Sequence, residues 1–261
     1  MIDFHCHILW EMDDGSDSIE QAKSMAFIAA NEGIDTIIAT PHCMDEKDLK
    51  EFAGRVQESC NLLQERVEQD GLEINIVPGA EVYLDPALLE MEGLELITLN
   101  NTQYMLIELP MGELPRYTED FIYHLQLKGL IPIIAHPERN LSIIDNPNIM
   151  LRLIDLGALA QINTGSITGF FGSKVQQCAQ ILLTHGMGHL LGTDAHSDRR
   201  RGPYMQEAVR KLREWLEPQQ VEEIIYTTPQ NIYAGKSVLV STPTEYHKKK
   251  SIFSFLRRKA Q

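Results

Sequence analysis

The strongest constraint on the fold is a regular alternation of short apolar runs with longer amphipathic stretches. Residues 36–40 are mostly β-branched and uncharged, as expected of a strand that is buried on both faces. Residues 18–31 repeat apolar side chains at the i, i+3, i+4 spacing of an amphipathic helix. Strands are predicted at residues 1–7, 36–40, 74–81, 104–109, 131–136, 158–163 and 189–196. Helices are predicted at residues 18–31, 45–69, 117–128, 147–156, 173–186, 204–217 and 221–226, with a turn at 227–231.

This order of elements favours one large α/β domain. Strands that alternate with helices are typical of a parallel sheet, and seven such units favour closure into a barrel. We therefore predict a single barrel over residues 1–240, with its chemistry at the carboxyl ends of the strands, where the loops of a barrel share one mouth. From residue 241 the composition becomes polar and basic, with six lysines and arginines against one glutamate. Residues 241–261 are predicted to form a basic, flexible tail.

Composition narrows the environment and the partners. Hydrophobic residues make up 43% and charged residues 23% of the 261 residues, as in an ordinary globular protein. The formal net charge of −14 argues against a nucleic-acid partner, because phosphate backbones repel such a surface. No signal peptide is visible, and no run approaches the roughly 20 apolar residues that a membrane span needs, so we expect a cytoplasmic protein. The four cysteines form no CxxC pair and are expected to be free thiols that pack in the core.

Ionisable side chains recur where the predicted strands end. His5 and His7 are two residues apart, so on a strand they project from the same face and could hold one ion. Other strands end on similar residues, and a core does not accept so many ionisable groups without counter-charges. The set predicts a metal cluster formed by His5, His7, Asp14, His42, Glu81, Glu108, His136, Asp194 and His196.

The ligand types indicate the metal and the reaction. Imidazoles and carboxylates without a required thiolate suit Mn²⁺, Fe²⁺ or Zn²⁺, and nine ligands fit two or three ions. Such ions stabilise oxyanions and lower the pKa of water, which is hydrolytic chemistry. Arg139 and Arg201 follow two of these strands, and guanidinium groups bind phosphate bidentately. From position alone, a phosphate-binding role for these arginines and an ordinary surface role are equally supported.

The sequence offers little for other chemistries. Ser166, Ser197 and Thr164 lie in no nucleophile elbow with a histidine relay, and no glycine-rich nucleotide loop is present. The remaining histidines, His124, His185, His189 and His247, are assigned to packing or to solvent.

Five motifs occur in a fixed order along the chain. They are Asp-Phe-His-Cys-His at 3–7, Ala-Thr-Pro-His at 39–42, Pro-Gly-Ala-Glu at 78–81, Ile-Ala-His-Pro-Glu-Arg-Asn at 134–140 and Gly-Thr-Asp-Ala-His at 192–196. This set resembles the polymerase-and-histidinol-phosphatase (PHP) superfamily of metal-dependent phosphoesterases. Longer stretches at 104–110, 132–140 and 158–166 resemble one branch, the bacterial manganese-dependent protein-tyrosine phosphatases of capsule and exopolysaccharide synthesis.

The resemblance, which covers about residues 1–235, implies a fold and a ligand assignment. The fold is a distorted (β/α)7 TIM-like barrel, and the cofactor is Mn²⁺, with Fe²⁺ or Zn²⁺ as alternatives. Arg139 and Arg201 match the positions that hold substrate phosphate. One ion would take His5, His7, Glu81 and Asp194; a second would share Glu81 and use Glu108 and His136; a third would take Asp14, His42 and His196. Ser16 and Cys43 depart from the branch pattern, where a proline and a histidine are common, and this leaves the shape of the rim open.

The implied activity is hydrolysis of phosphotyrosine on a protein, with a bacterial tyrosine kinase that controls capsule synthesis as the expected partner. His42 or His196 would protonate the leaving phenolate. A small-molecule phosphatase of the histidinol phosphate type and a metal-stabilised binding module without activity are the alternatives. The resemblance also implies a homo-oligomer. For the basic tail, weak contact with an anionic membrane and a solvated end without a partner both stay open.

Overall fold

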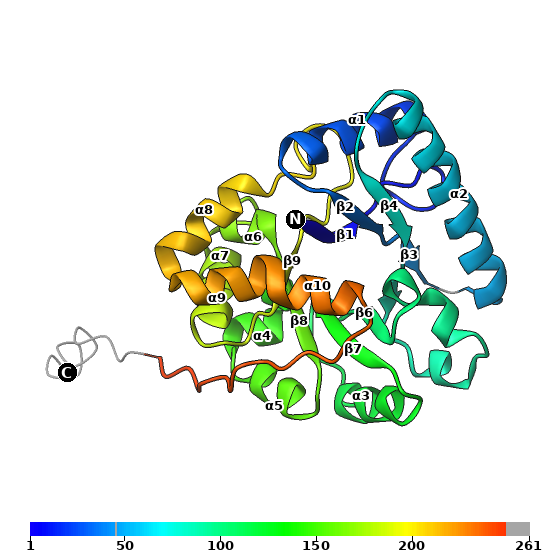
Figure 1. The fold of residues 1–261 in the computed structure, drawn as a ribbon. Helices are drawn as coiled ribbons and strands as arrows, with labels where there is room; N and C mark the ends of the chain where they lie inside the picture. The colour runs from blue at the N-terminus through cyan, green and yellow to red at the C-terminus, as the bar shows by residue number, and fades with distance from the viewer. Residues whose placement is uncertain (45, 249–261) are drawn as a thin grey trace, which may run out of the picture.

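The strands form two curled parallel sheets. The computed structural model describes residues 1–44 and 46–248, and in this part of the chain the sheets have the orders β1-β2-β4 and β3-β5-β6-β7-β8-β9 (Figure 1). The strands are β1 Ile2–Cys6, β2 Thr36–Ala39, β3 His42–Cys43, β4 Asn75–Pro78, β5 Glu81–Tyr83, β6 Tyr104–Glu108, β7 Ile131–Ala135, β8 Leu159–Asn163 and β9 Leu190–Gly192. All pairings between these strands are parallel, which confirms the predicted α/β class.

Two extended runs pass from one sheet to the other. The chain leaves β2 at Ala39 and continues as β3 at His42, and it leaves β4 at Pro78 and continues as β5 at Glu81. The second crossing is close: a Cβ atom at Gly79 would lie only 2.8 Å from Cγ2 of Ile38, so glycine is needed there. The run at 74–81 is predicted as one strand, and the run at 36–40 as a strand that is followed by His42. The structure divides each run between the two sheets.

On the side opposite these two crossings, β1 and the segment after β9 join the two sheets. Cys6 pairs with Ala195 in a parallel bridge, and the backbone N–H of Asp194 donates a 2.7 Å hydrogen bond to the carbonyl oxygen of His5. The two sheets therefore meet on both sides and curl around a shared interior.

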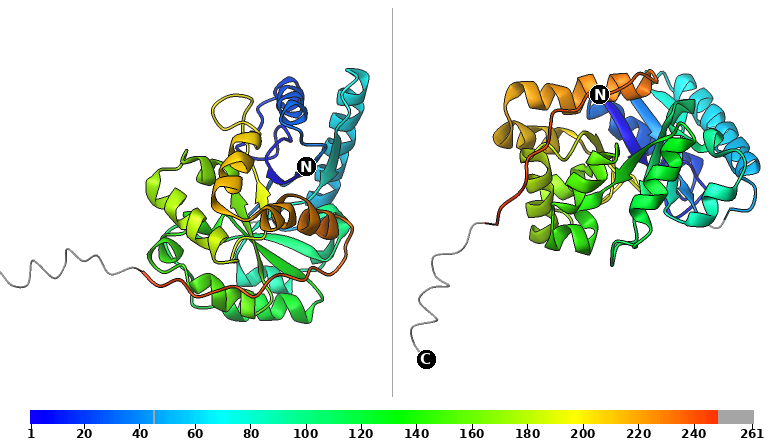
Figure 2. Two further views of the ribbon diagram at one scale, coloured as in Figure 1. Left: turned by 60° about the vertical axis from the view of Figure 1, so that its left-hand side comes forward. Right: turned by 90° about the horizontal axis from the view of Figure 1, so that it is seen from below.

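Helices cover the outer side of the curled sheets (Figure 2). They are α1 Ile19–Asn31, α2 Leu49–Gln69, α3 Thr118–Leu127, α4 Leu141–Asp145, α5 Ile149–Asp155, α6 Thr164–Thr168, α7 Ser173–Thr184, α8 Gln206–Trp215, α9 Pro218–Glu222 and α10 Thr228–Tyr233. The short 3-10 helices are η1 Pro86–Glu90, η2 Leu94–Ile97, η3 Leu99–Asn101 and η4 Pro137–Arg139, and η5 Glu223–Thr227 is a π-helical turn.

The longest helix, α2, shows how the sequence specifies its bounds. The Asp48 side chain accepts hydrogen bonds from the backbone N–H groups of Lys50 and Glu51, which have no partner within the helix. The six apolar residues predicted on its inner side are all buried: Leu49, Phe52, Val56, Cys60, Leu63 and Val67. The predicted start at residue 45 lies outside the described residues, and the helix begins at Leu49.

The predicted turn at 227–231 is wrong, because these residues enter helix α10. The helical backbone continues from η5 through Thr227 and Thr228 without a break, and Pro229 follows them near the start of α10. The side chain of Ile232 is fully buried in the interior, in a cluster that includes Ile2 at the start of β1. Helix α10 therefore covers the amino-terminal end of the curled sheets, and in Figure 1 it crosses in front of the strands.

The interior is apolar at this end and polar at the other. Leu106 and Leu159 belong to the interior cluster, and residues two positions further along the same strands share their face. Those residues are Glu108 on β6 and Gln161 on β8. The polar end therefore coincides with the carboxyl ends of the strands, where the sequence placed its candidate ligands.

Part of the predicted tail contacts the rest of the molecule. Tyr246 exchanges two hydrogen bonds with the Asn148 side chain, of 2.8 and 2.9 Å, and the backbone N–H of Thr244 donates to the carbonyl oxygen of His185 at 2.9 Å. The residues of the tail from 249 onward, and with them the predicted membrane contact, lie outside the described residues. The boundary after residue 240 stays a prediction.

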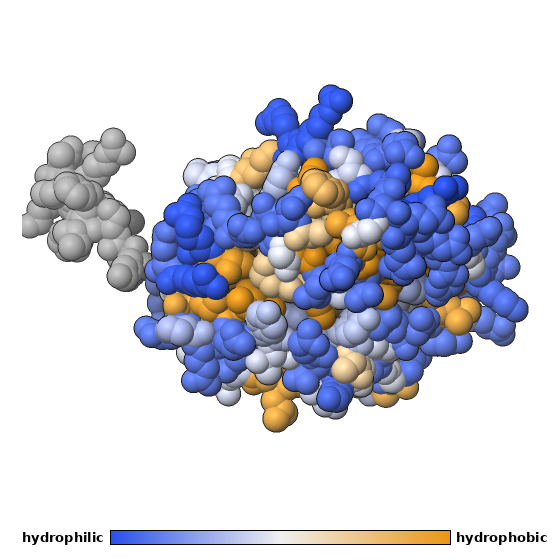
Figure 3. All heavy atoms as spheres, turned by 45° about the horizontal axis from the view of Figure 1, so that its top comes forward, coloured by the Kyte–Doolittle hydropathy of each residue, from blue (hydrophilic) through white to orange (hydrophobic). Residues whose placement is uncertain are grey.

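The described helices include none that is both long enough and apolar enough to cross a membrane. Hydrophilic residues cover most of the face shown in Figure 3, and apolar ones form smaller patches between them.

Candidate metal centre

The fold gathers the side chains of all nine predicted ligands at the carboxyl ends of the strands. His42 and Glu81 face each other across the β3-β5 pair, and His136 and Asp194 come directly after β7 and near the end of β9. Each of the nine side chains has a donor atom within 4.0 Å of a donor atom of another. Their proximity follows from the parallel sheet, which brings residues far apart in sequence to one edge.

The first group of donors surrounds the imidazoles of the opening strand. Nε2 of His5 and Nε2 of His7 are 3.0 Å apart, so both rings point to one place, as their spacing predicts. Oε2 of Glu81 lies 3.1 Å from the first nitrogen and 3.2 Å from the second. Oδ1 of Asp194 lies 3.7 and 3.6 Å from the same two atoms.

Glu81 connects this group with a second one. Its Oε1 accepts from Nε2 of His136 at 2.9 Å, and the same nitrogen lies 3.8 Å from Oε1 of Glu108. The two oxygens of the buried Glu81 carboxylate thus face different histidines, an arrangement that a bridging carboxylate between two cations would have.

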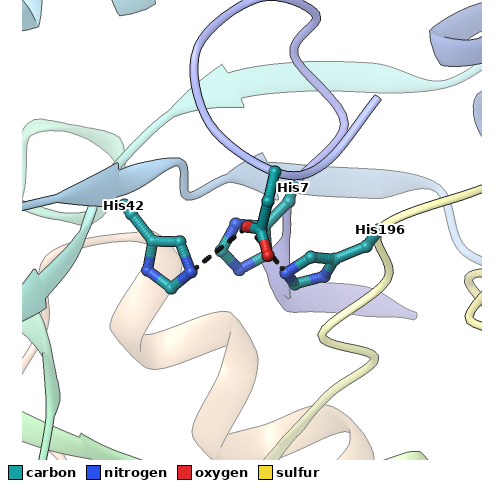
Figure 4. A group of neighbouring side chains, drawn as sticks. His7, His42 and His196 are labelled. Carbon is teal, nitrogen blue, oxygen red and sulfur yellow. Dashed lines mark ion pairs between the residues drawn. The ribbon is translucent and has the colours of Figure 1, made fainter. Parts of the chain in front are cut away.

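The third group lies nearest the solvent. Oδ1 of Asp14 is 3.5 Å from Nε2 of His42 and 3.4 Å from Nε2 of His196. Figure 4 shows the rings of His42 and His196 turned toward each other, with His7 between them. His7 is close enough to serve this group as well as the first, since one of its ring nitrogens lies within 4.8 Å of donor atoms of the other three residues.

The electrostatics of these residues fit divalent cations. Nδ1 of His42 and Oε2 of Glu81 are buried and have no hydrogen-bond partner among the described residues, although they lie 3.1 Å apart. Burial and the neighbouring Glu81 carboxylate raise the pKa of Glu108, because two carboxylates in one site disfavour each other's charge. Unpartnered ligand atoms and facing carboxylates are both relieved by bound cations.

One residue beside the site was missed from the sequence. Nδ1 of His7 lies 2.7 Å from Oδ2 of Asp13, and the same oxygen accepts from the backbone N–H of His42 at 2.8 Å. Burial alone would lower the pKa of His7, but Asp13 and Glu81 outweigh it and raise that pKa to about 10. Carboxylates that orient a ligating imidazole in this way are common at metal sites. Asp13 adjoins the predicted ligand Asp14, and the sequence alone did not separate their roles.

A hydrogen-bond chain along β8 was also missed. Oε1 of Gln161 lies 2.9 Å from Nδ1 of His5, Nε2 of Gln161 donates to Oδ1 of Asn163 at 2.9 Å, and Nδ2 of Asn163 donates to Oδ2 of Asp194 at 2.7 Å. All four side chains are buried. The sequence gives little signal for these two residues, because amides on one face of an otherwise apolar strand are as readily packing residues.

The predicted arginines converge on one carboxylate. Nη1 of Arg139 donates to Oδ2 of Asp194 at 2.6 Å, and Nη2 of Arg201 donates to Oδ1 of the same residue at 2.7 Å. Both guanidinium groups stay partly exposed, so an anion in the mouth could reach them. Asp194 and His136 have φ values of +54° and +30°, which is a left-handed conformation that costs a residue other than glycine free energy.

The other four histidines lie outside the cluster and are either packed against other residues or exposed to solvent. His189 is buried, and its Nδ1 accepts from the backbone N–H of Ala160 at 2.9 Å. His124 and His247 are exposed, and the His185 ring packs edge-on against Tyr246. All four cysteines, Cys6, Cys43, Cys60 and Cys178, are free thiols buried in the core, as predicted.

Comparison with known proteins identifies the family. The family described as "Capsular polysaccharide synthesis, CpsB/CapC" matches residues 1–234. Tyrosine-protein phosphatase YwqE of Bacillus subtilis (strain 168) is 35% identical over 258 residues, which cover 98% of this chain and 100% of the relative. Tyrosine-protein phosphatase CpsB of Streptococcus pneumoniae is 31% identical over 240 residues, which cover 89% of this chain and 98% of the relative.

A solved structure agrees with these relatives. It comes from the crystal structures of YwqE from Bacillus subtilis and CpsB from Streptococcus pneumoniae, described as unique metal-dependent tyrosine phosphatases. It superposes with a TM-score of 0.86 at 33% identity and covers 95% of this chain and 100% of the solved one. The ordered motifs, the cluster of imidazole and carboxylate side chains and these matches together show that the chain belongs to the CpsB/CapC family of capsular polysaccharide synthesis.

Proposed function

We propose that this protein is a metal-dependent protein-tyrosine phosphatase of capsule or exopolysaccharide synthesis. The observation that carries the proposal is the cluster of nine imidazole and carboxylate side chains, which extends from the buried Glu81 to the exposed Asp14, with two arginines at its edge. Relatives of nearly full length are named tyrosine-protein phosphatases. The proposed substrate is phosphotyrosine on a protein, with a bacterial tyrosine kinase as the expected partner.

The three donor groups support an assignment to three ions. We assign His5, His7, Glu81 and Asp194 to the first ion. Glu81, Glu108 and His136 would hold the second, and Asp14, His42 and His196 the third. The donor set suits Mn²⁺, Fe²⁺ or Zn²⁺, and we propose Mn²⁺. When bound, such ions supply Lewis acidity and an activated water.

The chain's own residues would bind and orient the phosphate ester. Arg139 and Arg201 would exchange part of their contact with Asp194 for the equatorial oxygens of the phosphate, as guanidinium groups do with planar oxyanions. A water oxygen forms the new bond to phosphorus as the bond to the tyrosine oxygen breaks, and the leaving oxygen takes up a proton. His42 or His196 would donate that proton, although a phenol with a pKa of about 10 leaves readily.

The remaining proposals concern the molecule as a whole. The seven extended runs, two of them divided between the sheets, support a distorted (β/α)7 barrel with residues 1–240 as its domain. We further propose a homo-oligomer in a cytoplasmic location. Weak membrane contact through the basic tail stays a prediction.

Reconstitution with defined metals tests the function. The metal-free protein is loaded with Mn²⁺, Fe²⁺ or Zn²⁺, and bound metal and hydrolysis of a phosphotyrosyl peptide are measured together. We expect two or three ions per chain and a kcat/KM for the peptide far above that for histidinol phosphate. The opposite ranking would favour the small-molecule phosphatase, and bound metal without any hydrolysis would favour a binding module.

Substitution of single ligands tests the site. His136→Ala and Asp194→Ala are each expected to lower kcat by at least about 100-fold, because a lost ligand removes or displaces an ion that stabilises the transition state. Full activity of either variant on aryl phosphates with added Mn²⁺ would contradict the mechanism.

A further inference from the structure

A cavity of about 220 Å³ adjoins the metal centre at the carboxyl ends of β8 and β9. One side is formed by α6 and the residues that follow it, including Thr168, Phe170 and Phe171, and the other by Arg200, Arg201 and Tyr204. The cavity is smaller than the roughly 300–1,000 Å³ of sites for drug-sized ligands. A single side chain is therefore the appropriate size of occupant.

Both candidate phosphate-binding arginines connect this cavity with the metal centre. Arg201 lines the cavity and also donates to Oδ1 of Asp194 at 2.7 Å. Arg139, which donates to Oδ2 of Asp194, lies over the ring of Phe171 with its guanidinium carbon 4.5 Å from the ring centre. A phosphate held by these two arginines would have the cavity directly beside it.

The walls of the cavity are aromatic, and glycines make room for the rings. A Cβ atom at Gly165 would lie 2.9 Å from the ring of Phe171, and one at Gly202 would lie 2.7 Å from the ring of Tyr204. Arg200 adds a guanidinium 5.8 Å from the ring centre of Phe170. Aromatic faces and guanidinium planes are the surfaces on which another aromatic ring stacks favourably.

We propose that this cavity, the aryl pocket lined by Phe170, Phe171 and Tyr204, holds the phenyl ring of the phosphotyrosine whose phosphate lies at the metal centre. The inference rests on the proposed phosphatase function and adds the origin of its selectivity. An alkyl phosphate ester, such as phosphoserine, would fill the phosphate site and leave the aryl pocket empty. The pocket therefore favours tyrosyl over seryl esters by binding the ring.

Two phosphonates that differ only in the ring test this proposal by equilibrium binding. Calorimetry on the Mn²⁺-loaded protein measures the Kd of phenylphosphonate and of methylphosphonate. Tyr204→Ala and Phe171→Leu are expected to weaken phenylphosphonate at least fivefold, about 1 kcal/mol, and methylphosphonate less than twofold. Tyr123 is an exposed aromatic residue on α3. The variant Tyr123→Ala is therefore the matched control and should change neither Kd.

The alternative outcomes contradict the proposal in different ways. Equal weakening of both phosphonates would mean that the aromatic residues support the phosphate site only. If both variants bound the two phosphonates with unchanged Kd but had a raised KM for a phosphotyrosyl peptide, the cavity would be assigned to a neighbouring residue of the substrate. In either case, hydrolysis of phenyl phosphate by the unchanged protein would leave the phosphatase function intact, whereas its absence with every metal would overturn that function itself.

Discussion

At the scale of single residues, Gln161 determines which nitrogen of His5 is free to bind a cation. Its Oε1 lies 2.9 Å from Nδ1 of His5, so Nδ1 carries the proton and Nε2, which faces Glu81, presents a lone pair. Asp13 does the same for His7 through its Nδ1. Acceptors of this kind fix the tautomer of a ligating imidazole and contribute to metal affinity without touching the ion.

Gln161→Leu should therefore weaken metal binding while leaving the fold intact. We expect Mn²⁺ affinity to fall about 10- to 100-fold, because the His5 proton can then move to Nε2 and compete with the ion. Gln161→Glu restores the acceptor and should recover most of the affinity. The measurement is a metal titration followed by calorimetry. Equal losses of Mn²⁺ affinity in the two variants would show that the hydrogen-bond acceptor for Nδ1 of His5 does not determine this affinity.

His189 predicts a pH dependence of stability away from the metal centre. Burial lowers its pKa from 6.5 to about 4, so the imidazole is neutral in the folded state and the unfolded chain binds the extra proton. Stability from this residue is fully present above pH 6.5 and is lost as the pH falls toward 4. At pH 5.5 the loss is on the order of 1 kcal/mol.

Urea unfolding between pH 5.5 and 7.5 measures this loss against the variant His189→Asn. The asparagine can still accept from the backbone N–H of Ala160 but does not titrate. The difference in unfolding free energy between the two proteins should change by about 1 kcal/mol over this interval. A constant difference would mean that His189 has no depressed pKa.

At the scale of elements, periodicity predicted helices well where one face alone is buried. In α2 the i, i+3, i+4 pattern identified every buried position, because burial of one stripe imposes that spacing. It failed for α10, whose Thr-Thr-Pro start has the composition of a turn. This segment is helical because of a tertiary contact, in which Ile232 fills the amino-terminal end of the interior. The local sequence does not predict that contact.

Ile232→Ala tests the role of α10 as a cover for the interior. A fully buried isoleucine replaced by alanine leaves a cavity, and the expected loss is about 2–5 kcal/mol of unfolding free energy. Leu239→Ala, at a residue that is 97% exposed, should cost no more than about 0.5 kcal/mol. Denaturant unfolding of both variants provides the comparison. A loss below about 1 kcal/mol for Ile232→Ala would mean that α10 is not needed to close the interior.

At the scale of the whole molecule, the strand ends were predictable and the connections among them were not. A parallel sheet places all carboxyl ends at one edge, so His42 and Glu81 could be assigned to one site without any knowledge of distances. The orienting residues Asp13, Gln161 and Asn163 carry no comparable signal, since an amide on a strand is as readily a packing residue. The aryl pocket depends on loops after β8 and β9, whose paths are set by contacts between segments distant in sequence.

The cluster also predicts that cations stabilise the entire fold. Its ligands come from β1 and the loop that follows it, from β3, β5 and β6, and from the segments after β7 and β9, so the site exists only when both sheets are assembled. A ligand that binds the folded state alone adds RT ln(1 + [L]/Kd) to the free energy of unfolding, about 2.7 kcal/mol at 100 times Kd. We therefore expect Mn²⁺ to raise the midpoint of thermal unfolding in proportion to the logarithm of its concentration, and chelation to reverse the effect.

The double variant His136→Ala/Asp194→Ala separates this effect from nonspecific binding of cations to an acidic surface. It retains nearly all of the net charge of −14, so screening of that charge should act on it as on the unchanged protein. The Mn²⁺-dependent rise should nevertheless be much smaller in the variant, because two of the three donor groups have each lost a ligand. Equal shifts in the two proteins would mean that the cations stabilise the molecule from its surface and not by joining the strand ends.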